Sequence, residues 1–254
     1  MAGLLPLLGW AASLPPTAMR EGDGSDGRVM QDWVRETILK QDLFSRVERG
    51  HFAGGDPAGQ WVLRDTSCAR WWASPLARFL ERHEIRALEA LKGFPGMPQL
   101  HLARGHVLIR SWIPGAPLQV AKPTDPAYYR RAFKLLVSLH RHGIAHNDLA
   151  KEPNWLVTPE GDPAVTDFQL AWVTRRRGPL FRLAAREDLR HLLKHKRKYC
   201  PEALTAREKS ILANRSLPAR IWLATGKRVY LFVTRRIFHW ADREGAHDRQ
   251  FPAS

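Results

Sequence analysis

Two short apolar runs on either side of a turn constrain the fold of this chain more than any other feature. Residues 155–157 (Trp-Leu-Val) and 163–165 (Pro-Ala-Val) flank a segment of Thr, Pro, Glu, Gly and Asp. This pattern predicts a β-hairpin. If the turn is centred on residues 160–161, Asn154 and Asp167 lie opposite each other at the open end of the hairpin. The sequence therefore predicts that one amide oxygen and one carboxylate converge on the same point.

The polar residues around this hairpin are of the types that phosphoryl transfer from Mg-ATP requires. Mg²⁺ prefers hard oxygen ligands and keeps the rest of its shell for water and phosphate. Asn154 and Asp167 are therefore the candidate metal ligands. Asp148 lies on the loop at residues 146–154 that enters the hairpin, where it is free to face an acceptor hydroxyl. The alternative is an ordinary loop and hairpin with solvated Asp and Asn side chains.

A helix is predicted to lead directly into this loop. Asp125 and Pro126 are typical of a helix start, because Asp is a good N-cap and Pro suits the first turn. The pattern continues to about His142, and Gly143 supplies the stop. The predicted order is therefore helix, glycine stop, loop, hairpin and metal carboxylate.

A second helix is predicted over residues 74–93. Ser74 as the N-cap and Pro75 as the first helical residue predict its start, and Gly93 predicts its end. Apolar residues recur along it at helical spacing, at Leu76, Leu80, Leu88 and Leu91. Such spacing is typical of a helix with one face directed at a core.

Glu84 lies in the same row as these leucines. A carboxylate in an apolar stripe is costly unless it is paired, so we expect a cationic partner. Arg64, on a strand predicted over residues 60–65, is the natural candidate. In the alternative interpretation, Glu84 lies in solvent at the edge of the stripe.

Glycines separate that strand from another strand predicted within residues 43–52. The backbone N–H groups of a glycine-bearing turn can face an anion, which makes Gly54 and Gly55 candidate phosphate-binding residues. A plain hairpin turn has the same composition, so the signal by itself is weak.

Residues 146–169 resemble the catalytic loop and metal motif of the protein-kinase-like superfamily. In that family a His-x-Asp loop supplies the base, a downstream Asn binds metal, and an Asp-Phe-Gly supplies the second metal ligand. The short, irregular form is similar to the atypical bacterial branch near RIO-type kinases and lipopolysaccharide-core (Kdo and heptose) kinases.

The resemblance implies an α+β, two-lobed fold and a division of the chain. After a flexible N-terminal tail at residues 1–29, residues 30–113 would form a small N-lobe, an antiparallel sheet with one helix. Residues 114–254 would form a mainly helical C-lobe, with the catalytic loop at 146–154 and the metal motif at 167–169.

The resemblance also implies a role for each candidate in the loop and hairpin. Asp148 would orient or deprotonate the acceptor hydroxyl, and Lys151 would neutralise charge on the transferred phosphoryl group. Asn154 and Asp167 would hold Mg²⁺. Asp188 would support the catalytic loop from the next helix, or simply pair with a nearby arginine.

The nucleotide contacts are implied in the same way. Arg64, set by Glu84, would bind the α- and β-phosphates of ATP in place of the usual lysine. Gly54 and Gly55 would lie over the phosphates. A buried strand predicted over residues 106–113 would lead into the hinge that holds adenine.

Three residues depart from the family pattern. Asn154 stands one residue further from Asp148 than the motif places it, which implies a bulged loop. Gln169 replaces the usual glycine and reduces backbone freedom after the phenylalanine. The third departure is the arginine at position 64.

The composition restricts the partners and the compartment. The formal net charge of +15 favours a polyanionic partner. Two cysteines make a disulfide framework implausible, and a reducing compartment fits. Because ATP is required, we expect a cytoplasmic protein, with a possible peripheral site at the inner face of the membrane. No run approaches ~20 apolar residues, so no transmembrane helix is expected.

Two basic segments have several interpretations. Residues 175–198, in which a helix is predicted over 187–194, have three interpretations: a solvated face, an acceptor site for an acidic substrate, or a membrane-surface patch. Residues 230–240 mix aromatics and cations, as core helices and interfacial helices both do.

The sequence thus predicts an ATP- and Mg²⁺-dependent phosphotransferase. A protein Ser/Thr is the default acceptor, and a lipopolysaccharide-core sugar on an acidic glycolipid is a close second. The alternative is a catalytically inactive kinase-like scaffold that binds anionic membrane or nucleic acid, although we do not expect nucleic acid as a partner of the enzyme.

Overall fold

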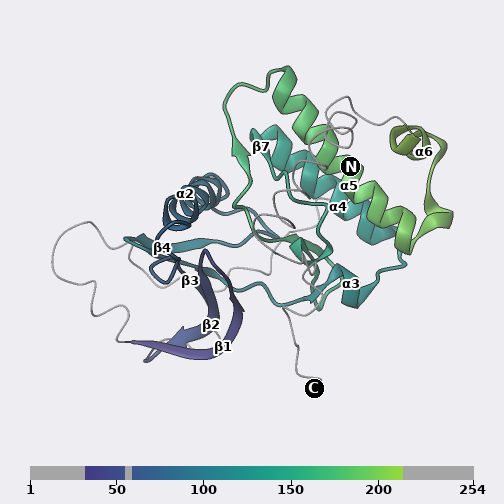
Figure 1. Cartoon of the computed structure of the whole chain (residues 1–254). Coiled ribbons are helices and arrows are strands. Elements are labelled where there is room, and N and C mark those ends of the chain that lie inside the picture. Colours follow the sequence, from purple (N-terminus) through teal and green to yellow (C-terminus); the bar gives the residue numbers. More distant parts are fainter. Residues whose placement is uncertain (1–31, 55–58, 214–254) are drawn as a thin grey trace, which may run out of the picture.

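The computed structural model describes residues 32–54 and 59–213 of the 254-residue chain. These residues form an α+β structure, as predicted, in which an antiparallel sheet has the strand order β1-β2-β3-β5-β4 (Figure 1). The strands are β1 (Trp33–Gln41), β2 (Arg46–Phe52), β3 (Trp61–Asp65), β4 (Leu100–Arg104) and β5 (Val107–Ser111).

The sequence predicted β2, β3 and β5 but not the two outer strands of the sheet. Most residues of β1 and β4 are exposed or half-exposed, so neither strand carries the buried apolar run that reveals a strand in the sequence. The outer strands are held by pairing with β2 and β5, which is a tertiary effect.

Helix α2 (Ser74–Ala90) lies against one face of the sheet, and its ends differ slightly from the prediction (Figure 1). Ala73, not Ser74, is the N-cap residue and makes no side-chain capping bond. The helix ends at Ala90, and Gly93 adopts its positive φ of 78° in the turn that follows. Of the leucines predicted on the apolar face, Leu88 and Leu91 are buried, whereas Leu76 near the start of the helix is 49% accessible.

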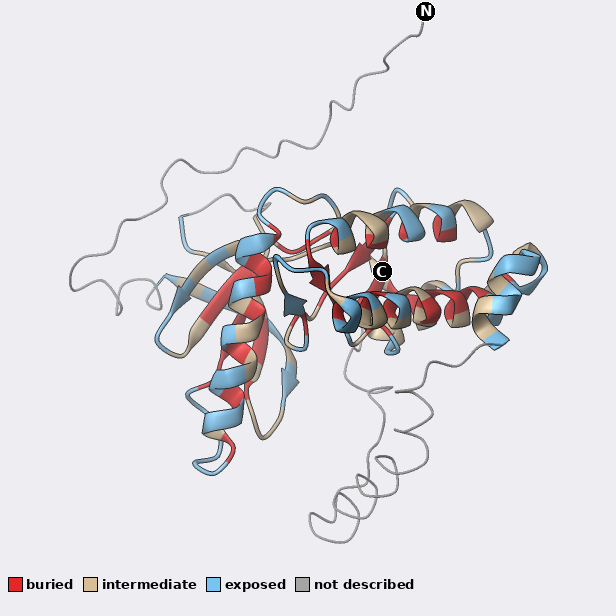
Figure 2. Cartoon of the chain, turned by 90° about the horizontal axis from the view of Figure 1, so that it is seen from above, coloured by how far each residue is buried: buried red, intermediate tan, exposed pale blue. Residues whose placement is uncertain are grey.

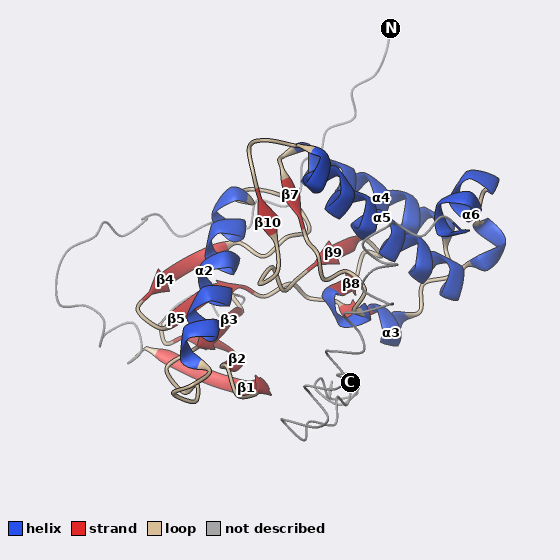
Figure 3. Cartoon of the chain, turned by 45° about the horizontal axis from the view of Figure 1, so that its top comes forward, coloured by secondary structure: helices blue, strands red, loops and turns tan. Residues whose placement is uncertain are grey.

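The remaining part of the chain is mainly helical, with short strands. Its helices are α3 (Leu118–Ala121), α4 (Pro126–Arg141), α5 (Pro179–Tyr199) and α6 (Ala206–Ala213), with 3₁₀ turns η1 (Glu152–Asn154) and η2 (Pro201–Ala203). Its strands are β6 (Ala116–Pro117), β7 (Ile144–Ala145), β8 (Trp155–Val157), β9 (Pro163–Val165) and β10 (Trp172–Val173). They form the sheets β6-β8-β9 and β10-β7 (Figure 3).

The predicted start of α4 is confirmed in detail. The Asp125 carboxylate accepts a hydrogen bond of 2.8 Å from the backbone N–H of Ala127, so Asp125 is the N-cap. Gly143, with φ of 75°, lies just beyond the end of the helix. Helix α5 includes the predicted 187–194 segment and extends well beyond it on both sides.

One continuous hydrophobic core joins the sheet side of the molecule to the helical side. Leu88 of α2 and Leu91, which caps its C-terminus, pack in the same cluster as Leu108 of β5, Leu136 of α4 and Trp155 of the hairpin. Figure 2 shows that the long helices each have one buried and one exposed side. Within the described residues no helix is long and apolar enough to span a bilayer, and the segment at 230–240 lies outside them.

Candidate functional site

The predicted hairpin is present, with a register one residue away from the expected one. Trp155 pairs with Val165, and the backbone N–H of Thr166 donates to the carbonyl of Asn154 at 3.0 Å. Asn154 therefore lies opposite Thr166, and Asp167 lies one residue further along. The prediction was wrong because the loop has five residues, 158–162, rather than a turn centred between residues 160 and 161. The two candidate metal ligands are diagonal neighbours at the open end.

Asp167 has an unusual backbone conformation for a residue with a side chain. Its φ of 65° lies in the left-handed region, which costs about 1–2 kcal/mol for a residue other than glycine. The kinase-like motif that this segment resembles has glycine at the position of Gln169, but Gln169 is not among the described residues with positive φ. The left-handed backbone conformation occurs at Asp167 instead, so a glutamine at position 169 is compatible with this segment.

The Asp167 carboxylate faces positive charge. Its Oδ1 lies 3.9 Å from Nη2 of Arg64 and has no hydrogen-bond partner among the described residues. Burial alone would raise the pKa of Asp167, but the nearby charges of Arg64, Arg110 and Lys151 outweigh burial and hold the pKa below its usual range. Asp167 is therefore an anion at neutral pH, and its buried Oδ1 accepts no hydrogen bond from the described residues.

The Asp148 carboxylate is held by two partners. Its Oδ2 lies 2.9 Å from Nζ of Lys151 and accepts a hydrogen bond of 3.0 Å from Nδ2 of Asn154. The same amide nitrogen also donates to the Asp148 carbonyl at 2.9 Å. Compared with the kinase-like motif, one additional residue separates Asn154 from Asp148. The 3₁₀ turn η1 accommodates this residue and places the Asn154 side chain in contact with Asp148.

The loop at residues 146–154 is held by a buried carboxylate from α5. Oδ2 and Oδ1 of Asp188 accept hydrogen bonds from the backbone N–H groups of His146 (2.7 Å) and Asn147 (2.9 Å). Nε2 of His140 lies 3.1 Å from Oδ2 of Asp188. The contacts predicted for Asp188 with the loop are therefore present, and no arginine of the described residues pairs with it.

His146 locks the other side of the loop. Its ring is fully buried, Nε2 lies 3.0 Å from the Thr166 carbonyl, and Nδ1 lies 3.3 Å from the backbone nitrogen of Asp148. These partners assign the neutral tautomer in which Nε2 donates and Nδ1 accepts, because the backbone nitrogen is a donor. The histidine thus connects the loop that carries Asp148 to the strand end that carries Asp167.

On the sheet side, the predicted pair of Arg64 and Glu84 is present, and a second arginine completes it. Glu84 is fully buried; its Oε2 lies 3.4 Å from Nε of Arg64 on β3 and its Oε1 lies 3.2 Å from Nε of Arg110 on β5. Val62 pairs with Arg110 in the sheet, which places both arginines on the same face.

The sequence analysis missed Arg110, although a signal was present. A cation in the middle of a strand predicted to be buried requires an acidic partner, and Glu84 was already predicted to lie among apolar side chains. The environment acts differently on the two guanidinium groups. Burial lowers the pKa of both, but the Glu84 and Asp167 carboxylates reverse this for Arg64, whose pKa is raised.

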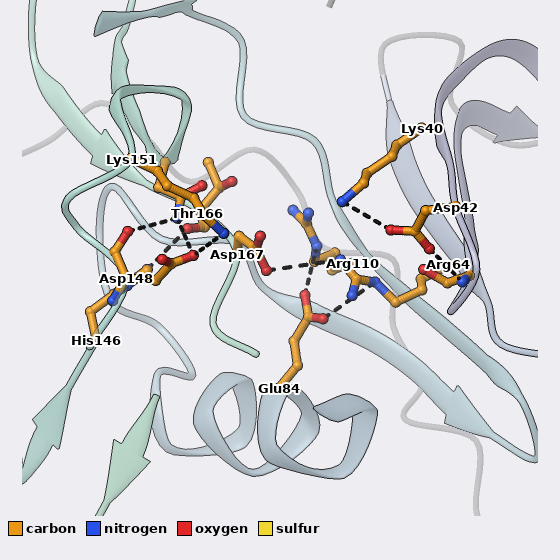
Figure 4. A network of polar contacts seen from close by, with 12 residues as sticks. Lys40, Asp42, Arg64, Glu84, Arg110, His146, Asp148, Lys151, Thr166 and Asp167 are labelled. Atoms are coloured by element: carbon orange, nitrogen blue, oxygen red, sulfur yellow. Dashed lines mark hydrogen bonds and ion pairs between the residues drawn. The ribbon is translucent and has the colours of Figure 1, made fainter. Parts of the chain in front are cut away.

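Figure 4 shows how these groups lie relative to one another. The Asp167 side chain lies between two clusters, the arginine–Glu84 group of the sheet and the Asp148–Lys151 pair of the loop. The structure therefore brings together six of the eight predicted site residues. They come from β3, α2, η1, the loop and the end of β9.

The phosphate-binding role of the two glycines stays a prediction. Gly54, with φ of 77°, follows β2, and Gly55 lies outside the described residues. The predicted hinge segment follows β5. Its Gly115 has φ of 157°, and a Cβ there would lie 2.8 Å from the Val157 carbonyl, so the close approach of β6 to β8 requires glycine. A role in binding adenine stays a prediction.

The residues present fit one hard cation with an open shell. Asp167 offers an ionised oxygen without a hydrogen-bond partner, and the Asn154 amide is oriented by its nitrogen, which leaves its oxygen to act as a ligand. In the described part of the chain, no group of three or more His, Cys, Asp or Glu gathers to enclose a metal. A Mg²⁺ ion held by one carboxylate and one amide would take its other ligands from phosphate and water.

Compared with known proteins, the sequence matches no family model and no curated protein.

Proposed function

We propose that this protein has a two-lobed, protein-kinase-like fold and transfers the γ-phosphate of ATP to a hydroxyl acceptor. The observation that carries the proposal is the position of Asp167, between the buried Arg64–Glu84 pair and the Asp148–Lys151 pair. A carboxylate with one oxygen that accepts no hydrogen bond from the described residues, a fixed cation on one side and a second carboxylate on the other is the arrangement that phosphoryl transfer requires. Both carboxylates and the asparagine are present, which argues against an inactive scaffold.

The roles of the residues follow from their contacts. Arg64, whose guanidinium is fixed by Glu84, would bind the α- and β-phosphates. Asn154 and Asp167 would hold Mg²⁺, which when bound neutralises phosphate charge. Lys151, 2.9 Å from Asp148, is close enough to stabilise charge on the transferred group.

In the transfer step, Asp148 accepts the proton or the hydrogen bond of the acceptor hydroxyl. The acceptor oxygen forms a bond to the γ-phosphorus while the bond between that phosphorus and the bridging oxygen of ADP breaks. The electron pair of the broken bond stays on ADP, and the proton passes from Asp148 to solvent. A protein Ser/Thr is our first choice of acceptor, and a lipopolysaccharide-core sugar is the second.

Calorimetry of ATP binding with and without Mg²⁺ tests the nucleotide site. Wild type should bind ATP in a Mg²⁺-dependent manner, and Asp167→Ala should lose most of this binding. Glu160→Ala is the matched control, because Glu160 is an exposed carboxylate in the turn of the same hairpin. Asp148→Asn should bind Mg-ATP nearly as wild type does and should lose transfer.

Two results would contradict the proposal. Wild type that binds no Mg-ATP would favour the inactive scaffold, for which steeply salt-dependent binding to anionic vesicles is the next measurement. Equal ATP affinity in wild type and Asp167→Ala would remove Asp167 from the nucleotide site. Both measurements are made on the full chain.

A further inference from the structure

A cavity of about 760 Å³ lies on the helical side of the molecule, away from the residues of the proposed transfer site. It is formed by the C-terminal half of α4, the segment that follows β10 and the first half of α5. Its floor is apolar, from Val137, Phe181, Ala185 and Leu189. Its rim carries five arginines, which are Arg141, Arg175, Arg177, Arg182 and Arg186. The volume is in the range of small-molecule sites, about 300–1,000 Å³.

Among the described residues, the five rim arginines have no acidic partner, because none of them lies within 4.0 Å of a carboxylate oxygen. The side chain of Arg182 instead donates from Nε to the carbonyl of Arg177 at 3.2 Å. Two other cations of α5 do have acidic partners, since Arg190 lies 3.4 Å from Glu187 and Lys196 lies 2.8 Å from Glu208. The rim therefore gathers five such guanidinium groups around one cavity.

The acids closest in sequence do not neutralise this rim. Glu187 is paired with Arg190. Asp188 is fully engaged by the catalytic loop and by His140. Several guanidinium groups around one concave surface repel one another, and an anion in the cavity removes this repulsion. Guanidinium groups bind phosphate oxygens bidentately, which makes a phosphate group the anion that this rim fits best.

We propose that this cavity is a binding site for a phosphorylated organic ligand, separate from the site of phosphoryl transfer. The phosphate would bind the arginine rim, and the carbon part of the ligand would pack on the floor formed by Phe181 and its neighbours. Inorganic phosphate would use only the rim and would bind more weakly. The site shares no residue with the proposed ATP site, so it does not depend on the proposed function.

The cavity is also connected to the catalytic loop through the side chains of His140 and Asp188. His140 lines it and contacts the same Asp188 oxygen that accepts the hydrogen bond of the His146 backbone. A ligand that occupies the cavity is therefore positioned to affect the loop that carries Asp148.

The test uses the full chain and 1-naphthyl phosphate as the probe, with inorganic phosphate beside it. The cavity variant is Arg175→Gln with Arg186→Gln. The matched control is Arg176→Gln with Arg197→Gln, which removes the same charge from the same loop and the same helix at exposed positions that do not line the cavity. Thermal melts of both variants check that they are folded, and the single variant Arg186→Gln provides a milder change.

We expect the cavity variant to bind 1-naphthyl phosphate about 10- to 100-fold more weakly than wild type, because two charge-assisted contacts are lost. The control should bind as wild type does, and inorganic phosphate should bind more weakly than the probe. No binding by wild type, or an equal loss in the cavity variant and the control, would overturn the proposal. Vesicles of phosphatidylcholine with and without phosphatidic acid identify the source. Vesicle binding that the cavity variant loses assigns a lipid headgroup, and probe binding alone assigns a soluble ligand.

Discussion

The fully buried Glu84 carboxylate should be the most sensitive position of the sheet side. Replacing it by glutamine keeps its shape but removes the negative charge that lies 3.4 Å from Nε of Arg64 and 3.2 Å from Nε of Arg110. Both guanidinium groups have side chains only 10% exposed, so water cannot replace the lost charge. Breaking a buried ion pair from one side costs about 3–5 kcal/mol, because a buried charge is left uncompensated.

The assay is unfolding by urea and by heat, with wild type and variants measured side by side. For a chain of this size about 1 kcal/mol corresponds to a shift of roughly 2–4 °C in Tm, so we expect Tm to fall by about 10 °C. Glu89→Gln is the control, because Glu89 is exposed on the same helix, and it should change the free energy of unfolding by less than about 0.5 kcal/mol.

A double variant separates the loss of charge pairing from a general loss of packing. The loss of unfolding free energy in the double variant Glu84→Gln with Arg110→Gln should be smaller than the sum of the losses in the two single variants. Glu84→Gln alone leaves two cations without their shared carboxylate, whereas the double variant leaves only Arg64. If Glu84→Gln is no less stable than Glu89→Gln, or if the two changes simply add, the reasoning from buried charge is refuted.

Two further predictions concern pH and the backbone. Burial, followed by the charge of Lys194, lowers the pKa of His191 from 6.5 to about 4. As the pH falls, His191 therefore takes up a proton near pH 6.5 in the unfolded chain but only near pH 4 in the folded chain. The free energy of unfolding should then decrease between these two pH values. In a pH series of Tm, the decrease should be smaller for His191→Gln than for wild type. Gly115→Ala should cost about 1–3 kcal/mol in urea unfolding, because φ of 157° is unfavourable for alanine and its Cβ would meet the Val157 carbonyl. The control Gly178→Ala, with no atom within 4 Å of the added Cβ, should be nearly neutral, and equal effects at both positions would contradict the assignment of strain.

Local signals made much of the site predictable. The start and end of α4, the loop and the hairpin follow one another in sequence, so capping residues and apolar runs specify them without knowledge of distant contacts. The pairing of Arg64 with Glu84 was predictable from a different argument, the cost of a buried carboxylate without a partner.

What the sequence could not specify depends on tertiary context. Whether Asn154 faces Thr166 or Asp167 depends on the length of one loop, and a change of one residue shifts the register. Strand β1 is recognised only by its pairing with β2, because its own residues are mostly exposed. The second partner of Glu84 is Arg110, and it could be recognised only from the strand order, which places β5 next to β3.

The core that joins the two sides of the molecule limits how the protein can move. Leu88 of α2 and its C-cap residue Leu91 belong to the same cluster as Leu136, Leu139 and Phe168 on the helical side. A clamshell opening between the sheet and the helices would bring these side chains into water, at about 1.5–3 kcal/mol for each leucine or phenylalanine. In the proposed function, nucleotide entry and product release therefore should not require the two sides to separate. We expect amide exchange to be slowest in α2, α4 and β9, and opening motions to be confined to the outer strands and peripheral loops.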